Sequence, residues 1–333
     1  MAFLDQNYLF TNPVAPELFD EIAELPILDP HNHADVKEIF ANQAYSDIWQ
    51  IEAATDHYVW EVMRKRGVPE EKVTGHASNE EKWLALAAIL PELAGNPTFE
   101  WIHLDLKRRF GITGLVSADT GADIWHQTKQ QLQTEAMKPR PMLADMRVEA
   151  MCSTDDPIDS LQWHRKLAQE KCTTRVLPTF RPDKAMNIHK PEWRDYIGKL
   201  GERVGESITS IRNVVAALQT CHDFFGENGC VASDHGVEVP YGYVVEEEDA
   251  DRVFRRAMNG DSLTRDEEIA YMSYLLHAVA AMDVAKGWVF QLHIGAVRDV
   301  RDVLARNIGP DSGGDVSCQI GRASCRERVC HRV

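Results

Sequence analysis

Five short apolar runs, each followed at once by charged or polar residues, constrain the fold of this chain more than any other feature. The runs occupy residues 25–29, 148–152, 175–180, 230–233 and 288–292. Three longer segments repeat apolar residues at helical spacing, over residues 158–169, 208–225 and 264–286. Strands that alternate with helices predict a parallel sheet with helical crossovers, either a closed (β/α) barrel or an open doubly wound sheet.

Polar side chains that follow the apolar runs favour the barrel. They form five groups: Asp29 with His31 and His33, Asp155 with Asp156, Arg181 with Asp183, Asp234 with His235, and His293 alone. Barrel enzymes collect their reactive groups at the carboxyl ends of the strands. We therefore expect an α/β fold of the (β/α)8 TIM-barrel type, incomplete because only about five strand–helix units are apparent.

Two segments outside this alternation differ from it in composition and in the spacing of their apolar residues. From about residue 34 to 138, tryptophan, leucine and charged residues recur at helical spacing, which predicts a helical insertion after the first strand. Residues 319–333 are basic and follow neither period; they resemble translated adapter sequence, and a native basic tail is the alternative. We expect a partial barrel domain over residues 1–318, a non-native-looking tail, and a natural chain that continues differently.

Composition narrows the range of partners. The net charge of −16 disfavours a nucleic acid, although one local arginine can still attract a small acidic substrate. No run approaches the roughly 18 apolar residues that span a membrane, and the N-terminus lacks a secretory signal, so we expect a cytoplasmic protein. The seven cysteines form no CxxC pair, which argues against a thiolate metal site. A homo-oligomer remains open.

The segment Asp29-Pro30-His31-Asn32-His33 is the sharpest motif in the chain. Side chains two residues apart at a strand end point the same way, so His31 and His33 can share one divalent cation. The alternative is a polar turn with incidental histidines. His293 follows the fifth apolar run and is a natural third member of the site; its alternative is a histidine bonded to a carbonyl group or to substrate.

Four further residues are candidates for substrate contacts. Arg181 has a planar fork suited to a carboxylate, and the alternative, which the residues alone favour, is an ion pair with Asp183 or Asp155. His235 can help to bind substrate or can belong to a structural polar network. His57 and Tyr58 lie in the predicted helical insertion, where ordinary packing explains most histidines and tyrosines.

Several of these motifs occur in longer stretches that resemble the uronate (glucuronate) isomerase family of the amidohydrolase superfamily. The stretches include LPILDPHNH, ATDHYVWEVMRKRGV, CSTDDPIDSLQWHRK, LPTFRPDKA, SDHG and QLHIGAVRD, and together they span nearly all of residues 3–316. The resemblance implies a barrel of the metal-dependent hydrolase type with a helical insertion. It also implies interconversion of D-glucuronate with D-fructuronate and of D-galacturonate with D-tagaturonate.

The same resemblance implies roles for single residues. His31 and His33 would be metal ligands from the first strand and His293 the later histidine of the centre, around a divalent ion that we expect to be Zn²⁺. The family also has a ligating aspartate in a TDSRS-like segment after its last strand, and this chain has no such segment.

The substrate side of the predicted site follows in the same way. His57 and Arg181 would contact the substrate carboxylate, and Tyr58 would lie beside the reacting carbons. Aldose–ketose isomerisation moves a proton between C2 and C1 through a cis-enediol, which a divalent ion can stabilise. Two alternatives remain: a metal-dependent hydrolase of the same fold, and a truncated chain without activity.

Overall fold

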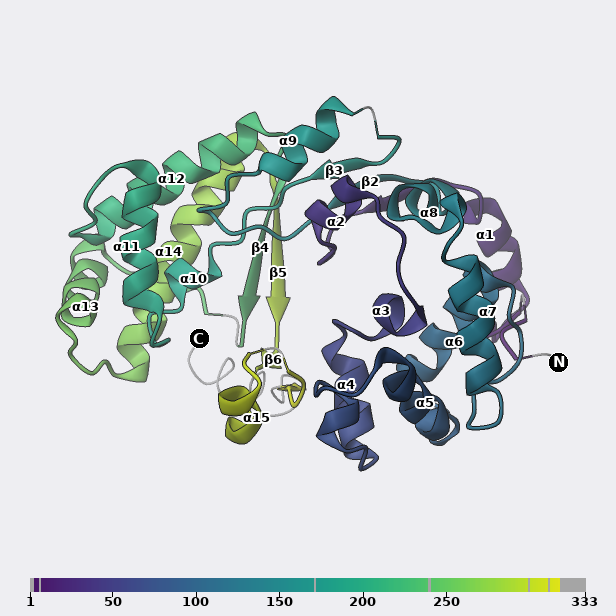
Figure 1. The fold of residues 1–333 in the computed structure, drawn as a ribbon. Coiled ribbons are helices and arrows are strands. Elements are labelled where there is room, and N and C mark those ends of the chain that lie inside the picture. The colour runs from purple at the N-terminus through teal and green to yellow at the C-terminus, as the bar shows by residue number, and fades with distance from the viewer. Residues whose placement is uncertain are drawn as a thin grey trace. The chain divides into compact units, whose positions relative to one another are not determined.

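The computed structural model describes residues 3–5, 7–170, 172–238, 241–298, 300–310 and 312–317 (Figure 1). The chain is divided into two compact units. The first, which we call the helical unit, comprises Met1–Ile27, Asn42–Arg147 and Arg298–Val316. The second, the strand unit, comprises Leu28–Ala41, Val148–Val297 and Ser317–Val333. The prediction for residues 319–333 lies outside the described residues.

Between Asp29 and Val148 the described chain contains helices and no strand, as expected for a helical insertion. Ser78 and Glu81 form a capping box at the start of one of its helices, and Gly111 ends another at φ +68°, a conformation that favours glycine. The elements of the helical unit are α1 (Val14–Ile22), α3 (Ile48–Glu52), α4 (His57–Lys65), η1 (Glu70–Lys72), α5 (Asn79–Ile89), η2 (Leu90–Leu93), α6 (Pro97–Phe110), α7 (Gly121–Gln131), η3 (Glu135–Met137), α8 (Pro139–Asp145) and α15 (Asp302–Asn307).

The strand unit has the predicted alternation. Two short strands, β1 (Ile27–Asp29) and β7 (Val316–Ser317), lie across the boundaries between the units. The other elements are α2 (Val36–Ala41), β2 (Val148–Cys152), α9 (Gln162–Gln169), β3 (Arg175–Leu177), α10 (Asp183–Met186), α11 (Trp193–Val204), α12 (Ile211–Glu227), β4 (Ala232–Val237), α13 (Glu247–Asn259), α14 (Arg265–Lys286), β5 (Val289–Ile294) and β6 (Ala296–Val297).

The five predicted strands follow one another in the sheet in chain order. β1 lies beside β2 and β2 beside β3, while β4 pairs with β5; the pairs β2–β3 and β4–β5 are parallel. Phe180, just after β3, bridges to Asp155 on one side and to Ser233 on the other, and so links the two groups of strands. Among the described strands β1 and β5 are the two edges, and closure into a barrel is not observed.

One predicted boundary is wrong in a way that matters for the site. The fourth apolar run was expected to end at Ser233, with Asp234 and His235 in the loop after it. The structure continues β4 to Val237, because both residues pair with β5, opposite Gln291 and Leu292. In a strand, neighbouring side chains point to opposite faces of the sheet. Asp234 and His235 therefore cannot serve the same site.

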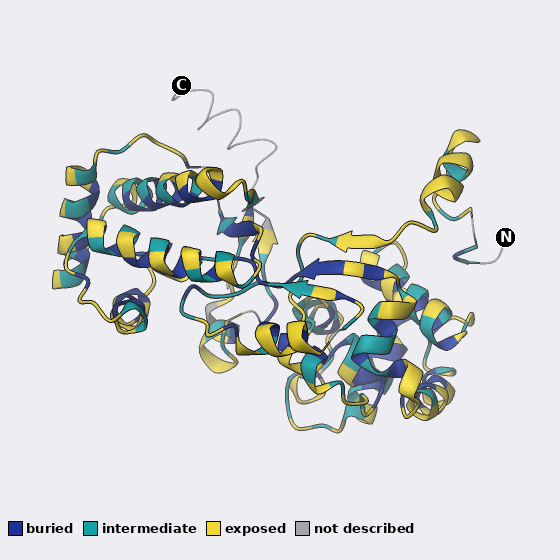
Figure 2. Cartoon of the chain, turned by 90° about the horizontal axis from the view of Figure 1, so that it is seen from above, coloured by how far each residue is buried: buried dark blue, intermediate teal, exposed yellow. Residues whose placement is uncertain are grey.

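Helices α11 to α14 pack around a shared apolar core. Phe180, Phe225, Phe254 and Tyr271 are fully buried or nearly so in this cluster. The helices have buried dark-blue faces beside exposed yellow ones in Figure 2, as amphipathic helices on a core do. Thr264 and Glu267 form a capping box at the start of α14. No helix in the described part of the chain is both long and apolar enough to cross a membrane.

Candidate metal centre

Three segments of the strand unit bring the candidate ligands together. Asp234 lies in β4 and His293 in β5, and the register of this parallel pair sets Gln291 opposite Asp234. His31 lies in the loop after β1. The side-chain amide of Gln291 donates to the Pro30 carbonyl at 2.9 Å, and so holds that loop against β5. The sheet thus fixes two ligands, and one hydrogen bond from β5 fixes the loop that carries the third.

The ligand atoms of His31, Asp234 and His293 lie within 4.8 Å of one another. Asp234 Oδ1 is 2.6 Å from His293 Nδ1, and Asp234 Oδ2 is 3.5 Å from His31 Nδ1. The two imidazole rings have centroids 4.3 Å apart. Imidazole nitrogens with a carboxylate oxygen form a donor set that is common for Zn²⁺.

The bonding state of these atoms shows that the residues fit a cation. His31 Nδ1 and Asp234 Oδ1 are buried and have no hydrogen-bond partner. A buried carboxylate oxygen without a partner costs free energy, and a bound cation would remove that cost. Burial lowers the pKa of His31 against the opposing charge of Asp234. A lowered pKa keeps the imidazole neutral, the form that binds a metal.

The structure brings together two of the three predicted ligands and adds a third. His31 and His293 meet as predicted, and Asp234 joins them. His33 is exposed; its ring centroid lies 4.9 Å from that of His31, but its nitrogens are outside the converging set. Its ligation stays a prediction. Asp234 had been recognised as polar at a strand end, yet the expected strand boundary gave no reason to prefer it over His235.

Arg181 lies beside this cluster and is already paired. Its Nε donates to Asp183 Oδ2 at 2.8 Å, and one terminal nitrogen donates to Asp234 Oδ2 at 3.0 Å. The ion pair with Asp183 that competed with substrate binding is therefore present. Burial raises the pKa of the Asp183 carboxyl, and the charge of Arg181 opposes that rise. The pairing of Arg181 with a substrate carboxylate therefore stays a prediction.

His235 is not brought to the cluster. Its side chain is fully buried, stacks on Phe290 with ring centroids 4.4 Å apart, and places Nε2 2.9 Å from Ser233 Oγ. Ser233 in turn donates to Asp283 of α14. Burial lowers the pKa of His235 to about 3, so it is neutral near pH 7. These contacts favour the structural polar network for His235, and its substrate contact stays a prediction.

The remaining predicted residues lie in the helical unit, at the start of α4. Asp56 caps this helix through bonds to the backbone of Tyr58 and Val59. Tyr58 is 49% exposed, so ordinary core packing does not account for it. The His57 ring lies 4.2 Å from the Tyr58 ring, and its Nε2 is 3.2 Å from a terminal nitrogen of Arg298. Within this unit Tyr58 is therefore exposed, whereas His57 is half-buried beside Arg298 and 3.8 Å from Asp315 Oδ2.

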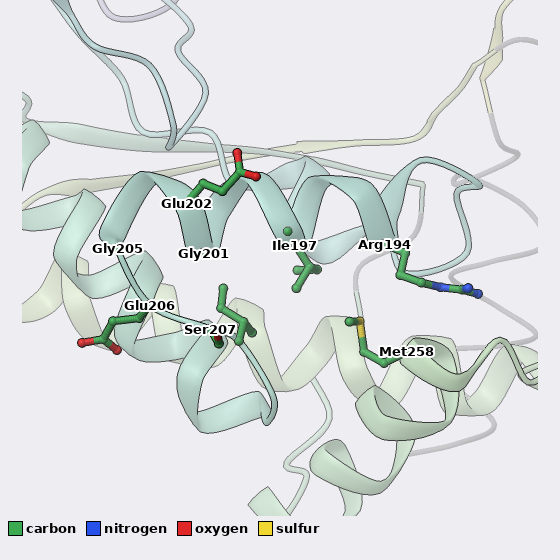
Figure 3. A pocket seen from close by; sticks show the side chains of 10 residues that line it. Arg194, Ile197, Gly201, Glu202, Gly205, Glu206, Ser207 and Met258 are labelled. Atoms are coloured by element: carbon green, nitrogen blue, oxygen red, sulfur yellow. The ribbon is translucent and has the colours of Figure 1, made fainter.

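A pocket of about 440 Å³ along α11 lies elsewhere in the strand unit (Figure 3). Its lining includes Arg194, Glu202, Ser207 and Met258, and none of the predicted site residues. The rest of the lining consists of Glu206, two isoleucines and three glycines, so the pocket contains no histidine or aspartate. The converging ligands at β4 and β5 therefore remain the candidate site.

Comparison with known proteins decides the family. The sequence model described as glucuronate isomerase matches residues 1–328. This chain belongs to the glucuronate isomerase family. The uronate isomerase of Thermotoga maritima is 50% identical over 315 residues, which cover 95% of this chain and 69% of that protein. That of Lachnospira eligens is 37% identical, over 94% of this chain and 67% of its own length.

Solved structures of this isomerase family agree with the fold. The crystal structure of the uronate isomerase of Thermotoga maritima matches with a TM-score of 0.91 at 49% identity, over 96% of this chain and 70% of the other. The glucuronate isomerase of Caulobacter crescentus matches at 0.89 with 22% identity, over 97% of this chain and 71% of the other, which bears on the fold alone. Membership favours an isomerase over the hydrolase alternative.

Proposed function

We propose that this isomerase interconverts D-glucuronate with D-fructuronate and D-galacturonate with D-tagaturonate. The observation that carries the proposal is the convergence of His31, Asp234 and His293 with Arg181 alongside. A cation site next to an arginine suits a sugar that has both a carbonyl group to polarise and a carboxylate to hold. Neutral sugars would leave the arginine without a partner from the substrate.

The proposed centre holds one divalent ion, with Zn²⁺ expected from the donor set. His31, Asp234 and His293 would hold it, and His33 is the predicted further ligand. When bound, such an ion polarises the carbonyl and hydroxyl oxygens of the open-chain sugar and favours the enediolate. The chain itself keeps both clustered histidines accessible, since the His31 and His293 side chains are 23% and 43% exposed.

The protein side chains would bind the acid and move the proton. Arg181, which lies beside the converging ligands and pairs with Asp183 and Asp234, is proposed to bind the substrate carboxylate. His57 is the second proposed carboxylate contact. The exposed hydroxyl of Tyr58 is proposed to assist the proton transfer between C2 and C1. The two helical-unit residues are supported by the family resemblance and by their own exposure.

The barrel is part of the same proposal. β1 and β5 are edges of the described sheet, yet the loop after β1 bonds to Gln291 of β5, and His31 lies against His293. A sheet whose first and fifth strands meet at their carboxyl ends must curl strongly, as barrel strands do. We propose a barrel of the metal-dependent hydrolase type, with the site at the carboxyl ends of its strands.

The test is isomerisation by the purified protein with and without metal. The protein is stripped with a chelator, reloaded with Zn²⁺, and given glucuronate in D₂O, with an amide and an ester as competing substrates. We expect only the reloaded protein to form fructuronate. This product should contain deuterium at C1, because the proton that leaves C2 exchanges with solvent. Hydrolysis of the amide or ester without any fructuronate would overturn the proposal.

A further inference from the structure

Arg181 is clamped on two sides by groups of the strand unit. Asp183, at the start of α10, accepts the Nε hydrogen of Arg181 at 2.8 Å. The backbone N–H of Gly236 in β4 donates to both Asp183 oxygens at 3.2 Å. Asp183 is thus fixed to the same strand that carries Asp234, the other carboxylate partner of Arg181. These contacts restrict the orientation of the Arg181 guanidinium.

Gly236 closes the clamp by its lack of a side chain. A Cβ atom built there would lie 2.7 Å from a terminal nitrogen of Arg181 and 3.0 Å from Asp183 Oδ2. Both distances are far below an ordinary van der Waals contact. The guanidinium therefore lies directly against the backbone of β4, in space that only glycine leaves open.

The clamp determines the orientation of the two oxygens of the Asp234 carboxylate. Arg181 donates a hydrogen bond to Asp234 Oδ2. The other oxygen, Asp234 Oδ1, lies 2.6 Å from His293 Nδ1 and has no hydrogen-bond partner. A carboxylate that is free to rotate would lose this division between its two oxygens. Groups that orient a ligand in this way change metal affinity although they never touch the metal.

We propose that Asp183 and Gly236 are positioning residues of the metal centre, which clamp Arg181 so that it turns Asp234 Oδ1 toward the two histidines. The inference rests on the proposed function, because it assumes that a cation binds at this cluster. It gives the ion pairs of Arg181 a role in the metal centre, because they orient one of the ligands.

The experiment measures Zn²⁺ affinity of the metal-free protein by competition with a chromophoric chelator. Asp183→Asn keeps the shape of the side chain but turns an amide toward the Arg181 donor. Gly236→Ala pushes the guanidinium from the other side. We expect each variant to bind Zn²⁺ about 10- to 100-fold more weakly. The spectrum of bound Co²⁺ should also change, because it reports the ligand geometry.

Asp156→Asn is the matched control. Asp156 also accepts from a backbone N–H and pairs with a cation, Lys184, but it does not contact Arg181. We expect its Zn²⁺ affinity to be unchanged. Circular dichroism melting curves separate folding from positioning, because a purely structural role would lower the Tm and leave the affinity of the folded protein intact.

The outcomes distinguish the two proposals. If the wild-type protein binds no Zn²⁺, the metal centre itself is wrong. If the wild type binds Zn²⁺ and both variants bind it equally well, the centre stands and the clamp is wrong. If Asp156→Asn weakens binding as much as Asp183→Asn, the effect is general to carboxylates of this unit, and the positioning role is also wrong.

Discussion

The two faces of β4 carry histidine–aspartate clusters that resemble each other in composition and differ in everything else. On one face Asp234 meets His31 and His293. On the other face Ser233 and His235 point toward α14, where Ser233 donates to Asp283. Because side chains alternate along a strand, these clusters come from neighbouring residues of one segment.

The difference lies in access and in how the polar atoms are used. On the second face His222, Ser233, His235 and Asp283 are all buried, and a chain of hydrogen bonds connects them. On the first face two histidines reach solvent, and unbonded ligand atoms point at one another. A histidine beside an aspartate is therefore not a sign of a reactive site by itself. The distinguishing features are access to solvent and the convergence of the ligand atoms, because His222 Nδ1 and His235 Nδ1 on the buried face also lack hydrogen-bond partners.

The largest expected effect is on the accessible face. Asp234→Ala and His31→Ala should each abolish stoichiometric metal binding and turnover together, since each removes one of the converging ligands. Elemental analysis of the purified variants and a glucuronate assay check this. A variant with full metal content would show that the missing residue is not a ligand. Full turnover without metal would show that the ion has no part in the reaction.

On the buried face the expected loss is in stability. Asp283 accepts from His222 and Ser233, and Asp283→Ala leaves both without their partner. Removal of one member of a buried pair costs about 3–5 kcal/mol of unfolding free energy. Urea denaturation measures it. Asp223→Ala is the control, because Asp223 pairs with Lys286 at the surface and should cost under about 1 kcal/mol. Equal losses of unfolding free energy in Asp283→Ala and Asp223→Ala would show that the buried cluster contributes no more stability than a surface ion pair.

Much of the strand unit could be predicted from its sequence, because apolar runs and helical periods are local signals. All five strands and the long helix followed from them. The helical character of the insertion followed from the same periodicity. These features depend on a few neighbouring residues, and the local pattern contains them.

The choice between the two faces of β4 could not be predicted. Asp234 and His235 are both polar, so the apolar run ended before them, and both were assigned to a loop. Only their pairing with Gln291 and Leu292 extends the strand, and that pairing joins segments more than 50 residues apart. The pairing of Arg181 with Asp234 depends on another long-range contact, the bridge between Phe180 and Ser233. Sequence spacing therefore showed which residues were available, and long-range pairing decided which of them meet.

A smaller effect tests whether Arg181 serves substrate as well as Asp234. In Arg181→Met, the KM for glucuronate should rise roughly 30- to 1,000-fold, because a charge-assisted, bidentate carboxylate contact is worth about 2–4 kcal/mol. The assay uses saturating Zn²⁺, so that weaker metal binding does not contribute. If KM barely changes under these conditions, the role of Arg181 is confined to its partners Asp183 and Asp234.

The last prediction is a pH dependence that arises from His235 on the buried face. Burial lowers the pKa of His235 to about 3 in the folded protein, whereas an unfolded histidine titrates near 6.5. Between these values the unfolded chain binds a proton that the folded chain does not. Stability is therefore complete above about pH 6.5 and falls as the pH is lowered, by about 1.4 kcal/mol per pH unit. Below about pH 3 no further loss arises from this group.

His235→Gln removes the titrating group and keeps a side chain that can bond to Ser233 Oγ. Urea unfolding between pH 6 and pH 4 should show a slope that is smaller by about 1.4 kcal/mol per pH unit in the variant than in the wild type. Equal slopes would mean that His235 takes up its proton without unfolding. That result would require solvent access which the buried face of β4 does not have, and the contrast between the two faces would then be lost.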